Sequence, residues 1–164
     1  MRADNPYLLR PGEGRLVRLH DLVIRHAVDG SQTASAFSIV EHVIEPKVLV
    51  KPHRHTREDE VSIVLSGTVS VRVGALEFQA GPGSYVVKPR DVPHAIWNMG
   101  PERSHVIEVV SPAGFERYFD ELEPILREKG PQWTEMFYAV AEKYGIIAED
   151  EWSNEIQKTY GVHL

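Results

Sequence analysis

Three histidines and one glutamate in the middle of the chain have the residue types and spacing of a metal site. His53 and His55 are two residues apart, so their side chains share a face if the segment is a β-strand. Glu60 opens the next β-rich run, and His94 follows a proline-rich turn. Where these strands are neighbours, the four side chains would hold one divalent transition metal. Iron, manganese, nickel, cobalt, copper and zinc all accept imidazole and carboxylate ligands, and ligand type alone does not choose among them.

The chain contains no cysteine. Disulfides, thiolate ligands, iron–sulfur clusters and a cysteine nucleophile are therefore excluded, and a metal site must use nitrogen and oxygen. An octahedral metal with four protein ligands keeps two positions open, which substrate or dioxygen would need.

Composition and length are those of a soluble globular protein, with 164 residues, 42% of them hydrophobic and 26% charged. We expect a single domain over residues 1–164. The net charge of −6 gives no electrostatic footprint for nucleic acid. No apolar run approaches the roughly 20 residues that span a bilayer, and charged residues interrupt the first 30 residues. We therefore expect a cytoplasmic protein that binds neither nucleic acid nor membrane.

The hydrophobic pattern changes once, near Ser111-Pro112. Before this point, short β-rich runs alternate with glycine, proline and aspartate breaks, which favours a sandwich or barrel of antiparallel strands. Strands are predicted near 15–19, 22–28, 35–44, 47–54, 60–66, 68–73, 76–79, 84–88, 94–99 and 104–110.

After Ser111, apolar residues recur at helical spacing. Ser111 is the predicted cap and Pro112 the first residue of the first helix, and Pro124 is expected to kink or split that helix. Gly130-Pro131 separates it from a second helix that ends near Gly145, and a short third helix is predicted near 150–159.

Two longer motifs contain the four candidate ligands. The first, H-x-H-x4-E-x6-G, runs through His53, His55, Glu60 and Gly67. The second, G-x5-P-x4-H-x3-N, runs through Gly83, Pro89, His94 and Asn98. With both motifs present in order, the chain resembles the cupin superfamily. Lys47 and Asp91 stand where the family pattern usually has glycine.

The resemblance implies a mainly β fold, a cupin-type antiparallel jelly-roll barrel with C-terminal α-helices. Its barrel core would cover about 35–110, preceded by strands at 15–28 and followed by a helical extension at 112–160. The segments 80–85, 92–95 and 111–116 give a looser similarity to single-domain quercetin 2,3-dioxygenase-like cupins. A homodimer paired through outer strands is the family-based expectation.

Strict alternation also predicts which residues face the metal. Ser62 and Val64 share the face of Glu60, Ile96 and Asn98 share the face of His94, and Asp59 and Trp97 point the opposite way. The further candidates for the pocket wall are Phe37, Val50, Phe78 and Tyr85. His42 and His105 are weaker candidates for facing the cavity, whereas His20, His26 and His163 are expected at the surface or in ordinary packing.

Similarity to quercetinases implies a dioxygenase that acts on an aromatic or enolisable small molecule. Glu60 would then remove a proton from a substrate hydroxyl, while the histidines hold the metal. Two alternatives stay open. One is a metal-dependent isomerase or lyase that needs no dioxygen, and the other is a non-catalytic cupin that binds a small molecule.

Overall fold

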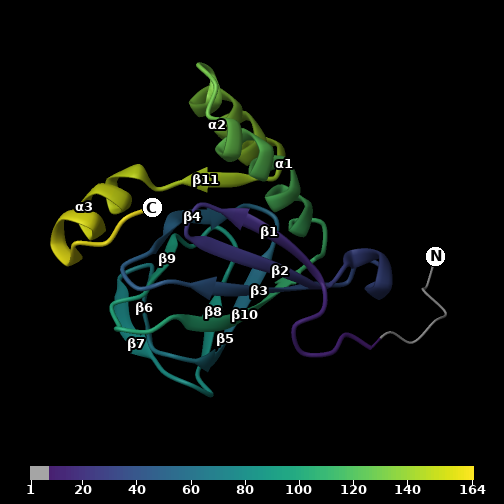
Figure 1. The fold of residues 1–164 in the computed structure, drawn as a ribbon, viewed down its shortest axis with the longest axis horizontal. Coiled ribbons are helices and arrows are strands. Elements are labelled where there is room, and N and C mark those ends of the chain that lie inside the picture. The colour runs from purple at the N-terminus through teal and green to yellow at the C-terminus, as the bar shows by residue number, and fades with distance from the viewer. Residues whose placement is uncertain (1–7) are drawn as a thin grey trace.

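A computed structural model describes residues 8–164, and it is mainly β with helices at the C-terminal end (Figure 1). Within these residues one antiparallel sheet has six strands, in the order β1-β2-β3-β10-β5-β8. Their bounds are β1 Arg15–Leu19, β2 Leu22–Val28, β3 Ser38–Ile44, β10 Ser104–Ser111, β5 Asp59–Ser66 and β8 Tyr85–Lys88.

A second antiparallel sheet has five strands among the described residues, in the order β11-β4-β9-β6-β7. Their bounds are β11 Ile146–Ala148, β4 Leu49–His55, β9 His94–Trp97, β6 Val69–Val73 and β7 Leu76–Ala80. From β3 to β10 the chain crosses repeatedly between the two sheets, which is the path of a jelly roll. Within residues 8–164 no strand ladder closes the two sheets into a continuous barrel.

The main core lies between the two sheets because alternate residues of the strands point inward. In β3 and β10 every second residue is buried, including Val40, Ile44, Val106 and Val110. This alternation is the pattern from which the sequence predicts half-buried strands. It also fixes which polar residues of the same strands reach the interior.

Three helices follow the strands: α1 Glu116–Glu128, α2 Trp133–Lys143 and α3 Asp150–Tyr160. In Figure 1, α1 and α2 lie together over one end of the sheets, and α3 lies beside β4. Helix α1 buries Tyr118, Phe119 and Leu122 in the main core. Helix α3 instead packs Ile156 against Trp97 on the other face of the second sheet. No helix formed by residues 8–164 is long and apolar enough to cross a membrane.

Several predicted boundaries need correction. Strand β3 begins at Ser38, because a short 3-10 helix at Gly30–Thr33 precedes it and Ala34 and Ser35 adopt left-handed backbone angles. The short strand β11, which pairs with β4, was not predicted. Helix α1 begins at Glu116, and the hydroxyl of Ser111 donates to a backbone carbonyl instead of capping it.

Pro124 was predicted to kink or split this helix; it lies inside α1, so the split is wrong, and the kink stays a prediction. The helix remains one element from Glu116 to Glu128.

Candidate metal centre

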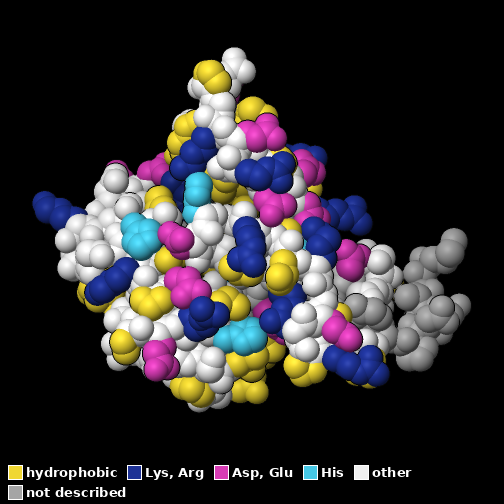
Figure 2. Space-filling model, viewed as in Figure 1, with side chains coloured by type: hydrophobic (Ala, Val, Ile, Leu, Met, Phe, Trp, Pro, Cys, Tyr) yellow, Lys and Arg dark blue, Asp and Glu magenta, His cyan; other side chains and the backbone are white. Residues whose placement is uncertain are grey.

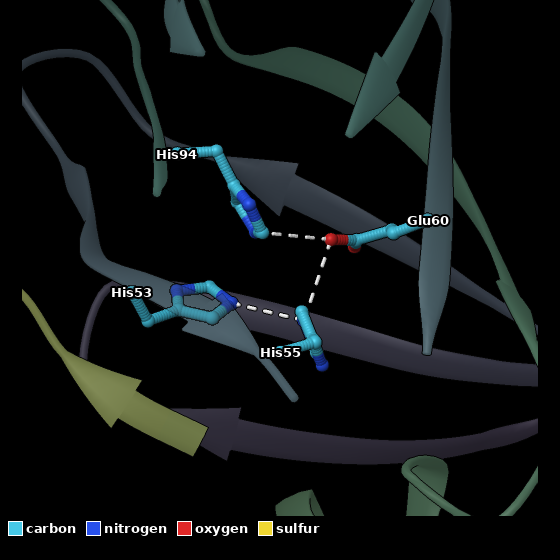
Figure 3. Close-up of side chains that lie close together, drawn as sticks. All are labelled: His53, His55, Glu60 and His94. Carbon is cyan, nitrogen blue, oxygen red and sulfur yellow. Dashed lines mark hydrogen bonds and ion pairs between the residues drawn. The ribbon is translucent and has the colours of Figure 1, made fainter. Parts of the chain in front are cut away.

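The four predicted ligands come from both sheets and converge at one point in the interior (Figure 3). His53 and His55 lie on β4, His94 on the neighbouring β9, and Glu60 on β5 of the facing sheet. In the β4–β9 ladder, His53 is directly opposite His94. One nitrogen or oxygen of each side chain lies within 4.8 Å of the others, so the group could hold a metal ion.

Backbone contacts orient two of the imidazoles. Nδ1 of His53 lies 2.7 Å from the carbonyl oxygen of Lys51, and Nδ1 of His94 lies 3.1 Å from that of Val92. Because a carbonyl only accepts, each Nδ1 carries the proton and each Nε2 keeps a lone pair. Such a partner on the second ring nitrogen is typical of metal-ligating histidines.

Nitrogen and oxygen atoms of this cluster face one another across short distances. Nε2 of His53 lies 3.2 Å from Nε2 of His55, and Nε2 of His94 lies 3.2 Å from Oε2 of Glu60. Among the described residues neither Nε2 of His94 nor Oε2 of Glu60 makes a hydrogen bond, although Oε2 forms an ion pair with Lys88 at 3.1 Å. Buried acceptors aimed at a common point fit a cation, because a cation satisfies all of them together.

Burial lowers the pKa of His53 and His94, which keeps these imidazoles neutral and able to bind metal. Burial also disfavours the charged form of His55, but contacts with Glu58 and Glu60 outweigh it and raise the pKa of His55 to about 9. Although burial raises the pKa of Glu60, Lys88 and the neighbouring histidines lower it well below the ordinary range. Glu60 is therefore ionised at neutral pH.

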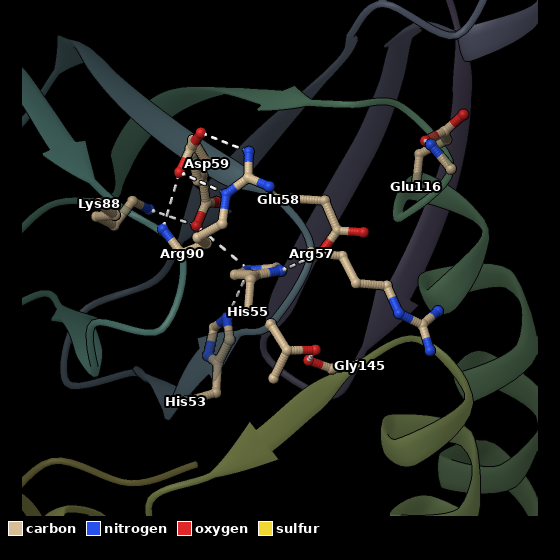
Figure 4. Close-up of polar contacts among 12 residues, drawn as sticks. His53, His55, Arg57, Glu58, Asp59, Lys88, Arg90, Glu116 and Gly145 are labelled. Atoms are coloured by element: carbon tan, nitrogen blue, oxygen red, sulfur yellow. Dashed lines mark hydrogen bonds and ion pairs between the residues drawn. The ribbon is translucent and has the colours of Figure 1, made fainter.

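The loop that carries His94 is tied to the strand that carries His55. The backbone N–H of Asp91 donates to the carbonyl of His55 at 2.7 Å, and Arg90 forms a 2.7 Å ion pair with Asp59 (Figure 4). Asp59 is exposed while Glu60 is buried, as alternation predicts. The two adjacent carboxylates thus have separate tasks, since Asp59 anchors the loop and Glu60 faces the cluster.

Lys47 and Asp91 have positive φ angles of 67° and 62°. These are left-handed conformations that favour glycine. The two turns therefore keep the backbone shape for which the family pattern uses glycine.

A cavity of about 290 Å³ lies between the cluster and the C-terminal helices. His53, Glu60 and His94 line one end, and apolar residues of the sheets and helices line most of the rest. From the C-terminal part of the chain, the wall includes Phe115, just before α1, and the helical residues Tyr118, Phe119, Leu122 and Phe137. A few polar groups in an apolar enclosure are typical of a small-molecule site.

Of the eight predicted pocket residues, two line the cavity and six do not. Val50 and Ile96 line the cavity. Ser62 and Val64 are buried on the face of Glu60, where Ser62 donates to Glu108 and Val64 joins the core. Asn98 is buried but binds the backbone of its own turn and of Ile44.

Three of these six residues are exposed, so the prediction that they form the pocket wall is corrected. Tyr85 is 71% exposed because Lys88 occupies the inward phase of β8. Phe78 is 39% exposed on β7, at the edge of its sheet, and Phe37 is 38% exposed just before β3. Trp97 packs against α3, on the face opposite His94, as predicted.

Two cavity residues were missed in the sequence. Lys88 Nζ lies 3.1 Å from Oε2 of Glu60 and 3.0 Å from Oε2 of Glu108, and all three side chains are buried. A charged residue at the inward phase of an apolar strand was the available signal, since Glu108 stands between Ile107 and Val109. His42 also lines the cavity, whereas His105 contacts Glu41 outside it.

Comparison with known proteins agrees with this geometry. Residues 40–110 match the family model described as the cupin domain. This part of the chain is therefore similar to cupin domains. No curated protein sequence matches the chain.

Solved structures share the fold of this chain. KdgF from Halomonas sp. superposes with a TM-score of 0.61 at 18% identity, covering 68% of this chain and 98% of KdgF. A predicted oxalate decarboxylase from Thermotoga maritima gives 0.60 at 17% identity, covering 65% and 99%. A cupin-superfamily sugar phosphate isomerase from Silicibacter pomeroyi gives 0.50 at 20% identity, covering 57% and 60%. At these identities the similarity concerns the fold alone.

Proposed function

We propose that His53, His55, Glu60 and His94 hold one divalent transition metal, and that the protein is a dioxygenase for an aromatic or enolisable small molecule. The observation that carries the metal proposal is the convergence of three imidazoles and one carboxylate within 4.8 Å at the end of an apolar cavity. A bound divalent ion would act as a Lewis acid and offer open positions to substrate and dioxygen.

The cavity supports the proposed substrate class. Aromatic rings of Phe115, Phe119 and Phe137 form part of its wall, and aromatic ligands pack well against such rings. With Glu108 ionised, the two buried carboxylates and the ammonium of Lys88 carry one net negative charge, which a divalent ion would reverse. The loaded site would then favour an anionic or deprotonated oxygen of the substrate.

In this proposal Glu60 is both a ligand and the base. Its carboxylate is ionised and faces the end of the cavity, where it would accept a proton from a substrate hydroxyl. Lys88, 3.1 Å away, holds Oε2 of Glu60 and limits its movement.

A second candidate function is a metal-dependent isomerase or lyase. It is favoured by the buried Lys88 and Glu108, which add acid–base groups beside the cluster that an isomerisation or elimination can use. The non-catalytic alternative requires that ligands bind but do not react.

One experiment separates these alternatives. Protein loaded with each of the six metals is mixed with flavonols, catechols and β-diketones, and dioxygen consumption and product are followed in air and under strict anaerobiosis. Dioxygen consumption that needs both metal and substrate, and that His94→Ala abolishes, would support the dioxygenase. Anaerobic turnover would support the isomerase or lyase, and binding without turnover would support the non-catalytic protein.

The acidic and basic side chains are interspersed on the face seen in Figure 2, with neither sign forming a continuous area there. This face therefore lacks the continuous basic patch that nucleic-acid binding uses. The homodimer and the cytoplasmic location stay predictions, the first testable by light scattering.

A further inference from the structure

A row of buried polar side chains crosses the inner face of the first sheet and ends at the candidate metal cluster. Glu60 on β5 contacts Lys88 on β8, and Lys88 contacts Glu108 on β10. Ser62 donates to the same oxygen of Glu108 at 2.7 Å. His42 on β3 is the last member of the row, with Nδ1 3.9 Å from Oε1 of Glu108. The row thus extends the polar lining of the cavity well beyond the four candidate ligands.

The far end of this row has unused hydrogen-bonding capacity. His42 is 4% exposed and lines the cavity, and neither of its ring nitrogens has a hydrogen-bond partner in residues 8–164. Oε1 of Glu108 is likewise buried without a partner. The 3.9 Å between them is too long for a direct hydrogen bond. Leaving buried polar atoms unpaired is unfavourable, so a partner is expected from the cavity.

The surroundings of His42 determine what it can bind. Burial lowers its pKa to about 4, so the imidazole is neutral at pH 7 and offers one donor and one acceptor. Its ring packs edge-on to Phe119, with the centroids 5.7 Å apart. A hydroxyl group suits the space beside it, because a hydroxyl can accept from an imidazole N–H and donate to a carboxylate oxygen.

We propose that His42 and Glu108 form a second anchor in the cavity, which binds a hydroxyl group of an apolar ligand whose anionic oxygen lies at the histidine–glutamate cluster. This inference rests on the proposed metal site and deepens it by naming the ligand class, a hydroxylated apolar organic anion. His42 is thereby a specificity-determining residue that positions the ligand and is not itself a metal ligand.

Binding of matched probes to Co²⁺-loaded protein tests this second anchor. The probes are phenylacetate and its 3-hydroxy, 4-hydroxy, 3-methyl and 4-methyl derivatives, so hydroxyl and methyl groups of similar size are compared at each ring position. Affinities come from calorimetric titration, and the visible absorption of Co²⁺ reports whether the metal is bound. The variant is His42→Phe, and the control is His105→Phe, which changes a histidine outside the cavity.

In the wild type, one of the two hydroxy probes is expected to bind about three to ten times more tightly than its methyl analogue, as one or two net hydrogen bonds allow. His42→Phe should abolish this preference while keeping Co²⁺ uptake and the affinity for phenylacetate. His105→Phe should keep the preference. The unfolding temperature of ligand-free His42→Phe should not fall, because the change removes two unpaired buried nitrogens.

Three results would overturn the second anchor: no hydroxyl preference in the wild type, a preference that survives His42→Phe, or no binding of any probe to Co²⁺-loaded protein. Failure of the wild type to take up Co²⁺ is a different outcome. It would overturn the proposed metal site first, and the second anchor with it.

Discussion

The ammonium of Lys88 lies between two buried carboxylates, 3.1 Å from Glu60 and 3.0 Å from Glu108. Glu60 is thus both a candidate metal ligand and one partner of a buried ion triad. The charge of Lys88 compensates carboxylates that would otherwise repel each other in the interior. This arrangement links the stability of the fold to the occupancy of the site.

Replacing Lys88 should expose this link. Lys88→Met leaves Glu60 and Glu108 without their ammonium, and breaking a buried pair costs about 3–5 kcal/mol of unfolding free energy. Added Zn²⁺ should raise the unfolding temperature of the variant more than that of the wild type, because the cation replaces the lost positive charge. Arg90→Met, which removes an exposed ion pair with Asp59, should show a smaller loss and no such excess. An equal Zn²⁺ effect in wild type and Lys88→Met would contradict the link.

Glu60 and Asp59 offer a test of the proposed base. Glu60→Gln should keep much of its metal through the three histidines and yet lose turnover by about 10²–10⁴, the usual worth of general-base catalysis. Asp59→Asn should be nearly neutral on both counts, because Asp59 faces solvent. Metal is titrated into each variant, and substrates found in the oxygen-consumption screen are assayed at saturating metal. Normal turnover of metal-loaded Glu60→Gln would show that Glu60 is not the base.

Glu108 predicts a specific dependence of stability on pH. Burial raises the pKa of Glu108 to about 7, although Lys88 opposes this shift. The folded state therefore binds this proton more tightly than the unfolded state, whose glutamate has a pKa near 4.3. The resulting stabilisation is complete below about pH 4.3 and is lost as the pH rises through about 7.

Denaturant unfolding of metal-free wild type and Glu108→Gln from pH 4 to 8 measures this dependence. The free energy of unfolding of the wild type, minus that of the variant, should decrease over the window from about pH 4.3 to 7. A difference that is constant or increases with pH would refute the assignment to Glu108.

The sequence motifs predicted the cluster because its residues follow a fixed spacing on alternating strands. His53, His55, Glu60 and His94 converge as the motifs imply, and the two sheets and C-terminal helices are present. Lys88 and Glu108 were missed because their importance depends on strand pairing: Lys88 is opposite Glu60 in the β5–β8 ladder, and Glu108 is opposite Ser62. The register in which β5 pairs with β8 and β10 is not evident from a single sequence.

The wall residues were harder to predict because side-chain direction depends on where each strand begins. Tyr85 and Lys88 have opposite orientations on β8: the sequence prediction places the aromatic residue in the wall, whereas the charged residue points inward. At two turns the family pattern predicts the backbone conformation correctly, although neither residue is the glycine of that pattern. Lys47 and Asp91 adopt the left-handed conformation without being glycine.

Replacing Lys47 with glycine measures the free-energy cost of the left-handed backbone conformation at this turn. A left-handed conformation costs a non-glycine residue about 1–2 kcal/mol, and glycine removes this strain. Glycine also increases the conformational entropy of the unfolded chain, which offsets part of the gain in stability. Lys47→Gly should therefore raise the free energy of unfolding by about 0.5–1 kcal/mol. Lys158→Gly, in the exposed part of α3, should lower it by about 1 kcal/mol. A destabilised Lys47→Gly would mean that contacts of the lysine side chain outweigh backbone strain.

The most direct test of the central claim is the metal stoichiometry of the untagged protein, measured by elemental analysis after equilibrium dialysis against each candidate ion. We expect about one ion per chain in the wild type and in His163→Ala, whose histidine is exposed and distant from the four ligands in the sequence. Alanine variants of His53, His55 and His94 should each lose most of the bound metal under the same conditions. A wild type that retains no ion, or histidine variants that retain as much as the wild type, would contradict the account.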